Sequence, residues 1–339
     1  MNSRKIIACL AAVPALLVSF GANAYEYKYG RNTFRLTGSA STENFDGGGF
    51  ADYLIRAQAS RLVSDGWNVG FVYSYDALAR RGGYYAKDAF AYVETKWGRI
   101  EAGWTESIAA KLALVLPDVG GTRLNNQPFF LKDGFEGITS PTVRGNQYAW
   151  RMNAASLPTR PWQFGIGRTV YADDFDGSTD IGIRYRHPQG RIKTSLSFGF
   201  SYIDRPHGMT GDAYLPPVFA TAQYQGTTGF NLQWGSLVWA ATGKVVVNDN
   251  PEPDSFKSDG LQAGTGLSYD FLSWSASAGY IFSYIGVWRG GENIAAHTGI
   301  LSARYKIRRY FNIWGSGGIV ALETRDPYYF LRLGAGVSF

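Results

Sequence analysis

Cysteine and histidine are both scarce in this chain. The single cysteine, Cys9, lies in an apolar segment near the start, so disulfides do not staple the rest of the chain. The three histidines are His187, His207 and His297, and none lies in a nucleophile motif. The sequence therefore gives little support to a Ser/His/acid catalytic set.

The first 24 residues read as a signal peptide. Arg4 and Lys5 precede an apolar run over 6–21, and "ANA" at 22–24 resembles a small-residue cleavage site. The alternative is a retained membrane anchor, but the run is short for one. We expect Sec-type export. Removal of Arg4 and Lys5 leaves 31 basic residues against 27 acidic ones, a net charge of +4.

Long apolar runs and clusters of one charge are absent beyond that leader. No later stretch has about 18 consecutive apolar residues, so we expect no helical membrane span. No basic cluster resembles a nucleic-acid patch, so no nucleic-acid partner is expected. What the chain has instead is 42 Gly, 22 Tyr, 21 Phe and 10 Trp, a composition that favours β-structure.

Side chains alternate between apolar and polar with period two from end to end. In "RIKTSLSFGFSY" (191–202), the apolar set and the small polar set fall on opposite faces of one strand. The stretches 34–41, 301–307 and 328–339 follow the same pattern. An antiparallel sandwich with one solvated face would also alternate in this way.

The connections distinguish a barrel from a sandwich. Short turns and longer polar loops alternate strictly, as in membrane barrels with one short-turn rim. Short turns are expected at 64–66, 98–99, 158–161, 188–190, near Gly235, at 272–273 and at 308–309. Loops are expected at 43–51, 77–86, 106–144, 172–177, 203–215, 249–259, 285–296 and 322–328. These connections predict an all-β fold: a transmembrane antiparallel β-barrel of 16 strands formed by residues 25–339.

The chemistry of a bilayer explains this pattern. Hydrocarbon offers no hydrogen-bond partners, so the sheet must close on itself. Arg184, Lys193, Arg304 and Arg332 all fall on the face opposite the apolar set, as a lumen requires. The last strand would close the ring, with Phe339 in an aromatic girdle at the short-turn rim.

The longest connection carries a family resemblance. It follows "KWGRIEAGW" (96–104) and contains "LPDVGG" (116–121). With the leader, the 16 strands and the terminal Phe339, it resembles the general-diffusion porins of the Gram-negative outer membrane. That family has a Pro-acidic-aromatic-Gly-Gly element in its third loop, where this chain has Val119 at the aromatic position.

The resemblance implies a constriction within the barrel. The loop over about 106–144 would bend into the lumen, with Pro117 fixing the bend, Gly120 and Gly121 allowing a tight backbone, and Asp118 facing the lumen. The constriction residues implied by the resemblance are Asp118, Glu106, Arg56, Arg151, Arg35 and Arg332.

The function expected from this resemblance is passive diffusion of small hydrophilic solutes and ions through a water-filled channel. Because wall bases outnumber loop acids, we expect a mild preference for anions. The resemblance also implies an outer-membrane location, contact with lipid, and a homotrimer. Gly38 and Ala40 would belong to the wall that packs on a neighbouring barrel. No catalytic residue, cofactor or metal is expected.

Three other functions stay open. A substrate-specific channel for sugars or organic anions could use Phe90, Tyr92 and the loop 127–135 as an aromatic track. An outer-membrane barrel enzyme is the second alternative. A structural or adhesive barrel is the third, although its loops would be larger. The acidic loop "ADDFDGS" (172–178) lacks the twelve-residue ligand pattern of a calcium loop.

Overall fold

Antiparallel β-strands make up most of the described chain in the computed structural model. The structure describes residues 25–45, 48–78, 83–119, 148–171, 177–187, 190–204, 220–251, 258–287, 294–307, 311–323 and 325–338. The strands are β1 (Tyr25–Tyr29), β2 (Asn32–Phe45), β3 (Gly48–Ser64), β4 (Trp67–Leu78), β5 (Gly83–Thr95), β6 (Gly98–Glu106), β7 (Tyr148–Ser156), β8 (Trp162–Tyr171), β9 (Gly177–His187), β10 (Ile192–Asp204), β11 (Ala220–Trp234), β12 (Leu237–Pro251), β13 (Ser258–Phe271), β14 (Trp274–Val287), β15 (Ile294–Lys306), β16 (Phe311–Leu322) and β17 (Arg325–Ser338). One short helix, α2 (Ile108–Leu112), follows β6.

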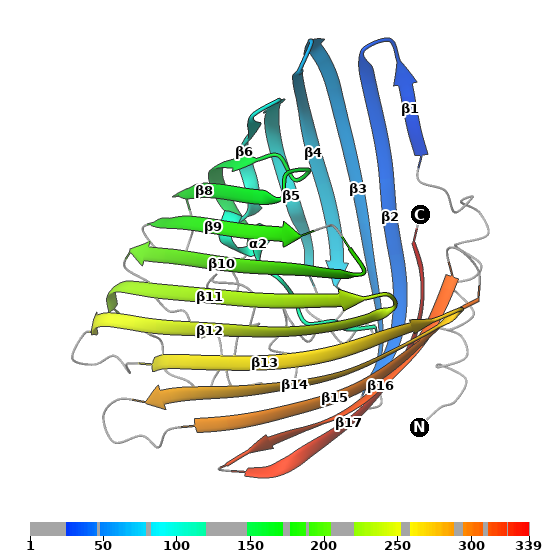
Figure 1. Cartoon of the computed structure of the whole chain (residues 1–339), viewed down its shortest axis with the longest axis vertical. Helices are drawn as coiled ribbons and strands as arrows, with labels where there is room; N and C mark the ends of the chain where they lie inside the picture. Colours follow the sequence, from blue (N-terminus) through cyan, green and yellow to red (C-terminus); the bar gives the residue numbers. More distant parts are fainter. Residues whose placement is uncertain are drawn as a thin grey trace.

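Strands β2 to β17 form a closed ring of sixteen. Each pairs with the next in sequence, and β17 pairs back with β2 through residues such as Val337 and Ala40. Figure 1 shows the sheet curving from the blue strands through the green and yellow ones to the red β17. The predicted 16-stranded antiparallel barrel is therefore confirmed, and closure leaves no strand edge unpaired within the ring.

A short additional strand, β1, precedes the ring and was not predicted. Its residues Tyr25–Tyr29 pair with Asn32–Leu36 of β2, and a tight turn at Gly30, with φ of +57°, joins the two strands. Strand β17 pairs with β2 only from Ser39 onward. Strands β1 and β17 thus share one edge of β2, each covering a different part of it.

The alternation of turns and loops agrees with the prediction. Seven short connections follow β3, β5, β7, β9, β11, β13 and β15, and they define the short-turn rim. Connections predicted as loops at 43–51, 77–86 and 322–328 are shorter than expected, because their residues extend the pairing of β2 with β3, of β4 with β5 and of β16 with β17. The predicted signal peptide (1–24) and Phe339 lie outside the described residues.

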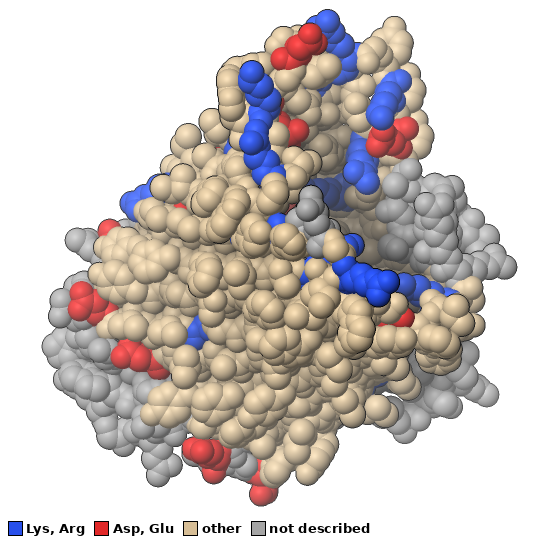
Figure 2. All heavy atoms as spheres, in the orientation of Figure 1, with Lys and Arg blue, Asp and Glu red and all other residues tan. Residues whose placement is uncertain are grey.

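The two faces of the sheet differ in chemistry. On β10, Phe198 and Phe200 are 55% and 44% exposed on the outer face, whereas Ser197 and Ser201 are buried on the inner face. Figure 2 shows that Lys and Arg gather mainly over the upper part of the visible surface, while a broad area of its lower part is nearly uncharged. No helix in the described part of the chain is long and apolar enough to cross a membrane.

Aromatic side chains follow the outer surface near the short-turn rim. Trp162 and Tyr185 lie with ring centroids 4.6 Å apart, and Trp274 and Tyr305 lie 4.7 Å apart. Other exposed tryptophans are Trp67 and Trp234 at the ends of strands and Trp97 in the turn between β5 and β6. This arrangement matches the interfacial girdle expected where a membrane barrel meets lipid headgroups.

Candidate functional site

The segment 107–119, which follows β6, lies on the inner face of the barrel. Ser107 caps α2, since its hydroxyl accepts a hydrogen bond from the Ala110 amide at 3.2 Å. The helix then buries Ile108, Ala109 and Leu112 against β8, β9 and β10. The described start of the predicted constriction loop is therefore docked on the inner wall.

A track of glycines on successive strands makes room for this segment. At Gly182 an added Cβ would lie 3.0 Å from Leu112, and at Gly229 it would lie 2.8 Å from Leu114. Both distances are shorter than ordinary packing allows, so only glycine permits this close approach. The glycines of the track are Gly165 and Gly167 on β8, Gly182 on β9, Gly199 on β10, Gly229 on β11 and Gly266 on β13.

Two backbone hydrogen bonds hold the segment along its length. The Leu114 amide donates to the Ser197 hydroxyl on β10 at 3.0 Å, and the Val119 amide donates to the Ser277 hydroxyl on β14 at 3.1 Å. Between these bonds Leu116 is 1% exposed, and Pro117 packs on Gly266. The segment thus crosses the inner wall from β6 to β14, and it presents Asp118 near its described end.

A cluster of charged side chains lies where α2 meets β6. The Lys111 amine forms an ion pair with Glu101, and it also donates to the Thr105 hydroxyl at 2.8 Å. The Asn153 amide donates to Glu101 at 2.9 Å, and Arg99 approaches the same carboxylate at 3.5 Å. Burial lowers the pKa of Lys111, while the Glu101 carboxylate opposes that shift. Glu101 therefore anchors the loop segment to the wall.

Arg151 lies behind the loop segment rather than in open lumen. It is 2% exposed, and its guanidinium donates to the Thr105 carbonyl at 2.6 Å and to the Thr169 hydroxyl at 3.2 Å. Its Nε lies 4.0 Å from Asp180 on β9. With these partners Arg151 braces the end of β6, from which the loop departs.

Arg56 is on the inner face and is paired. Its guanidinium lies 3.4 Å from the Asp88 carboxylate, and its side chain is 42% exposed. The Ser74 hydroxyl donates to the same carboxylate at 3.1 Å. Sequence reasoning missed Asp88, although it alternates with the inward-facing Phe90 and is in register with Ser74. The alternation with Phe90 was the available signal, because it places Asp88 on the inner face.

The other predicted constriction residues lie on the adjacent strands β2 and β17 and at the end of β6. Arg35 is exposed on β2, opposite Gln58 of β3 in the register. Arg332 is 2% exposed on β17. Glu106 ends β6, and its carbonyl accepts from the Asn153 amide at 3.0 Å. Gly120 and Gly121 lie outside the described residues.

No metal centre emerges from the part of the chain that the structure describes. It contains no group of three or more His, Cys, Asp or Glu side chains arranged to hold an ion. The described inner wall instead offers scattered charges, hydroxyls and amides around a docked loop. Such a surface can solvate and steer polar solutes without forming bonds to them.

Comparison with solved structures places the fold among outer-membrane barrels. An OmpT loop-deletion mutant from Vibrio cholerae superposes with a TM-score of 0.69 at 12% identity, over 91% of this chain and 100% of that one. Salmonella typhi OmpF gives 0.67 at 13% identity, over 93% and 100%. An anion-selective porin from Comamonas acidovorans gives 0.61 at 10% identity, over 91% and 100%.

These similarities concern the fold. No family model matches the sequence, and no curated protein does either. The chain has the closed 16-stranded barrel architecture of porins, with sequence identity to the structures compared above of 10–13%.

Proposed function

We propose that this protein is a porin of the Gram-negative outer membrane, a water-filled channel for passive diffusion of small hydrophilic solutes and ions, and not an enzyme. One observation carries the proposal: a closed ring of sixteen strands is apolar outside and polar inside, with a loop segment docked across its inner wall. A transverse arrangement of charges in a wet gap would then favour polar over apolar solutes.

The proposal includes a mild anion preference. Basic side chains outnumber acidic ones on the described inner faces of β9 and β10. The basic residues there are Arg184, Arg186 and Lys193, and the acidic one is Asp180. The structural similarity to an anion-selective porin supports the same direction. We expect current steps when the purified protein enters a planar bilayer, and a reversal potential in a salt gradient that reports anion preference. A measured cation preference would contradict the proposed anion preference but not the proposed channel. As a control, heat-denatured protein should give no current steps.

General diffusion is favoured over a substrate-specific channel. The inward aromatics that would form a track, Phe90 and Tyr92, are each 3% exposed. Arg99 covers Tyr92, with its guanidinium carbon 3.8 Å from the ring centroid. A solute would therefore meet charge before it met these rings. Saturable block of conductance by one sugar, with no effect of others, would favour the specific channel.

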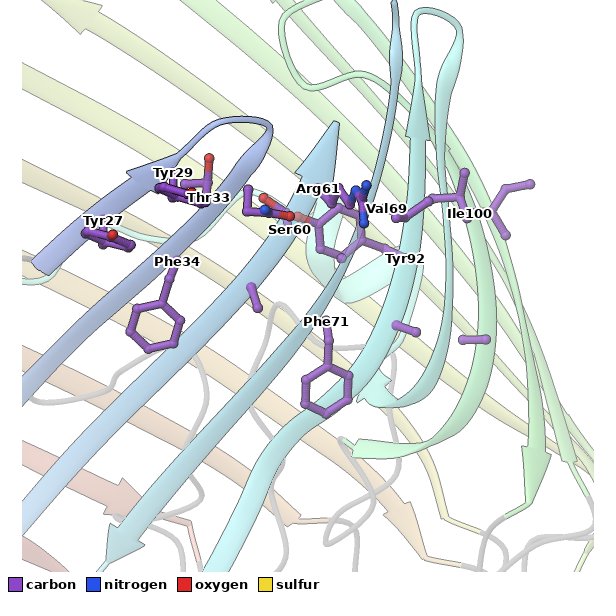
Figure 3. A pocket seen from close by; sticks show the side chains of 16 residues that line it. Tyr27, Tyr29, Thr33, Phe34, Ser60, Arg61, Val69, Phe71, Tyr92 and Ile100 are labelled. Carbon is purple, nitrogen blue, oxygen red and sulfur yellow. The ribbon is translucent and has the colours of Figure 1, made fainter. Parts of the chain in front are cut away.

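The proposal also includes a homotrimer embedded in outer-membrane lipid. An outer groove of about 900 Å³ crosses β1 to β6, and small residues such as Ala59 and Ala91 are among those that line it. Figure 3 shows Phe34 and Phe71 in this groove. Small residues let another wall approach closely, and a structurally similar barrel is described in a trimer form.

Substitution in this groove tests the oligomer. Ala59→Arg would place a charge in the proposed contact, and we expect the variant to migrate as a monomer in detergent size-exclusion chromatography. Ala303→Arg, on the exposed outer face of β15, is the matched control and should leave the oligomer intact. A trimer that survives Ala59→Arg would place the contact elsewhere.

A further inference from the structure

Three basic side chains gather on the inner wall between α2 and the short-turn rim. Arg184 and Arg186 are two residues apart on β9, so both face the lumen. Ser195 of β10 is opposite Arg186 in the register, and Lys193 lies on the same face two residues further along β10. Diagonal neighbours of this kind lie about 7–8 Å apart, within reach of long side chains.

Among the residues that the structure describes, no acidic side chain pairs with these cations. On the described inner faces of β8 to β11, Asp180 is the single acidic residue. It lies four residues along β9 from Arg184, roughly 13 Å away at the rise of a strand. Its carboxylate already accepts from the Ser201 and Ser178 hydroxyls. Arg184 and Arg186 make no ion pair in the described part of the chain.

Arg184 is also partly enclosed. Its Nε is buried without a hydrogen-bond partner among the described residues. Gly182, two residues away on the same face, is in contact with Leu112 of the docked segment. Arg184 therefore belongs to the stretch of β9 next to the docked segment, and around its buried Nε, where water is partly excluded, an ionic hydrogen bond gains strength.

We propose that Arg184 and Arg186 form a binding site for a tetrahedral oxyanion, as carried by phosphate, phosphate monoesters or sulfate. The site rests on the proposed channel function and names the solute class that it would favour. Two planar guanidinium groups can each donate two parallel hydrogen bonds to such an anion. The anion would also relieve the repulsion between two adjacent cations, and Ser195 adds a neutral donor on the neighbouring strand.

Inorganic phosphate is the probe for this site. In planar bilayers with constant chloride, phosphate should reduce the wild-type current with a saturating dependence on concentration. The double variant Arg184→Gln/Arg186→Gln should raise the half-blocking concentration by about ten-fold or more, since it removes two charge-assisted donors. The matched control is Arg304→Gln/Lys306→Gln, which removes the same charge from the inner face of β15 at the same rim.

Each outcome separates the site from the channel itself. Saturable block that is lost in the β9 variant and kept in the β15 variant supports the site. Equal increases of the half-blocking concentration in both variants would overturn it, because the overall positive charge at the short-turn rim would then explain the block. Block that never saturates would also overturn it. Absence of any chloride current in the wild type would instead refute the proposed channel.

Discussion

At the scale of single residues, the same strand pattern led to different environments. Arg56, Arg151 and Arg332 all alternate with apolar neighbours, and all three lie on the inner face. Arg56 is partly open beside Asp88, whereas Arg151 is enclosed by Thr105, Thr169 and Asp180. Burial behind the docked loop, rather than the face of the strand, decides which arginine a solute could reach.

Glu101→Gln tests the anchor of the loop. The change leaves Lys111 partly buried without its carboxylate, which should weaken docking by about 3 kcal/mol. We expect larger and more frequent current fluctuations in single-channel recordings. The matched control is Glu94→Gln, which removes another inward-facing carboxylate, on β5 and nearer the short-turn rim. Quiet currents in Glu101→Gln would show that apolar packing alone holds the segment.

At the scale of elements, the constriction segment depends on glycines that belong to other strands. Gly182, Gly229 and Gly266 lie on β9, β11 and β13, and each contacts a different part of the segment. Glycine inside a strand lowers the stability of the sheet, but at these positions it also allows the loop segment to pack closely against the wall. The docked position of the loop is therefore encoded largely outside the loop.

Gly229→Val tests this dependence. Its side chain would occupy the space beside Leu114 and the Ser197 hydroxyl, which lie 2.8 and 2.7 Å from an added Cβ. We expect the segment to shift from the wall and the single-channel conductance to change, with the folded barrel retained. Gly226→Val on the same strand is the control, since no atom lies within 4 Å of an added Cβ there. Equal conductance in both variants would contradict the packing argument.

At the scale of the whole molecule, closure of the ring turns the outward side of every strand into part of one outer surface, and that surface must be compatible with lipid. Phe198 lies at the middle of β10, and Ile192 begins that strand at the short-turn rim. Both are on the outer face and are 55% and 50% exposed. A bilayer around the barrel makes their tolerance of charge depend on depth.

Lysine substitution at these two positions measures that depth dependence. Phe198→Lys should lower the free energy of unfolding from lipid vesicles by roughly 2–4 kcal/mol, whereas Ile192→Lys should cost about 0–1 kcal/mol. Denaturant titration in vesicles gives both values. If the two variants were equally stable, a bilayer surrounding the middle of β10 would be ruled out.

Much of the architecture could be predicted from periodicity and connection length. Strand β10 was evident because Leu196, Phe198 and Phe200 alternate with serines and glycine over its whole length. Strand β1 was missed since five residues before Gly30 carry too short a pattern to stand out. Asp88 was missed as the partner of Arg56 because ion pairing across strands depends on register, which one strand does not reveal.

The amino-acid order alone determined the sixteen strands, the alternation of turns and loops, and the lumen side of Arg184, Lys193, Arg304 and Arg332, because period-two alternation and turn chemistry are local properties. Tertiary structure alone decided that Ile108 to Val119 would lie along a glycine track and that Arg151 would be enclosed, while Arg184 and Arg186 have no acidic partner among the described residues. Those features join strands far apart in the chain, and only closure of the barrel sets the distances between them.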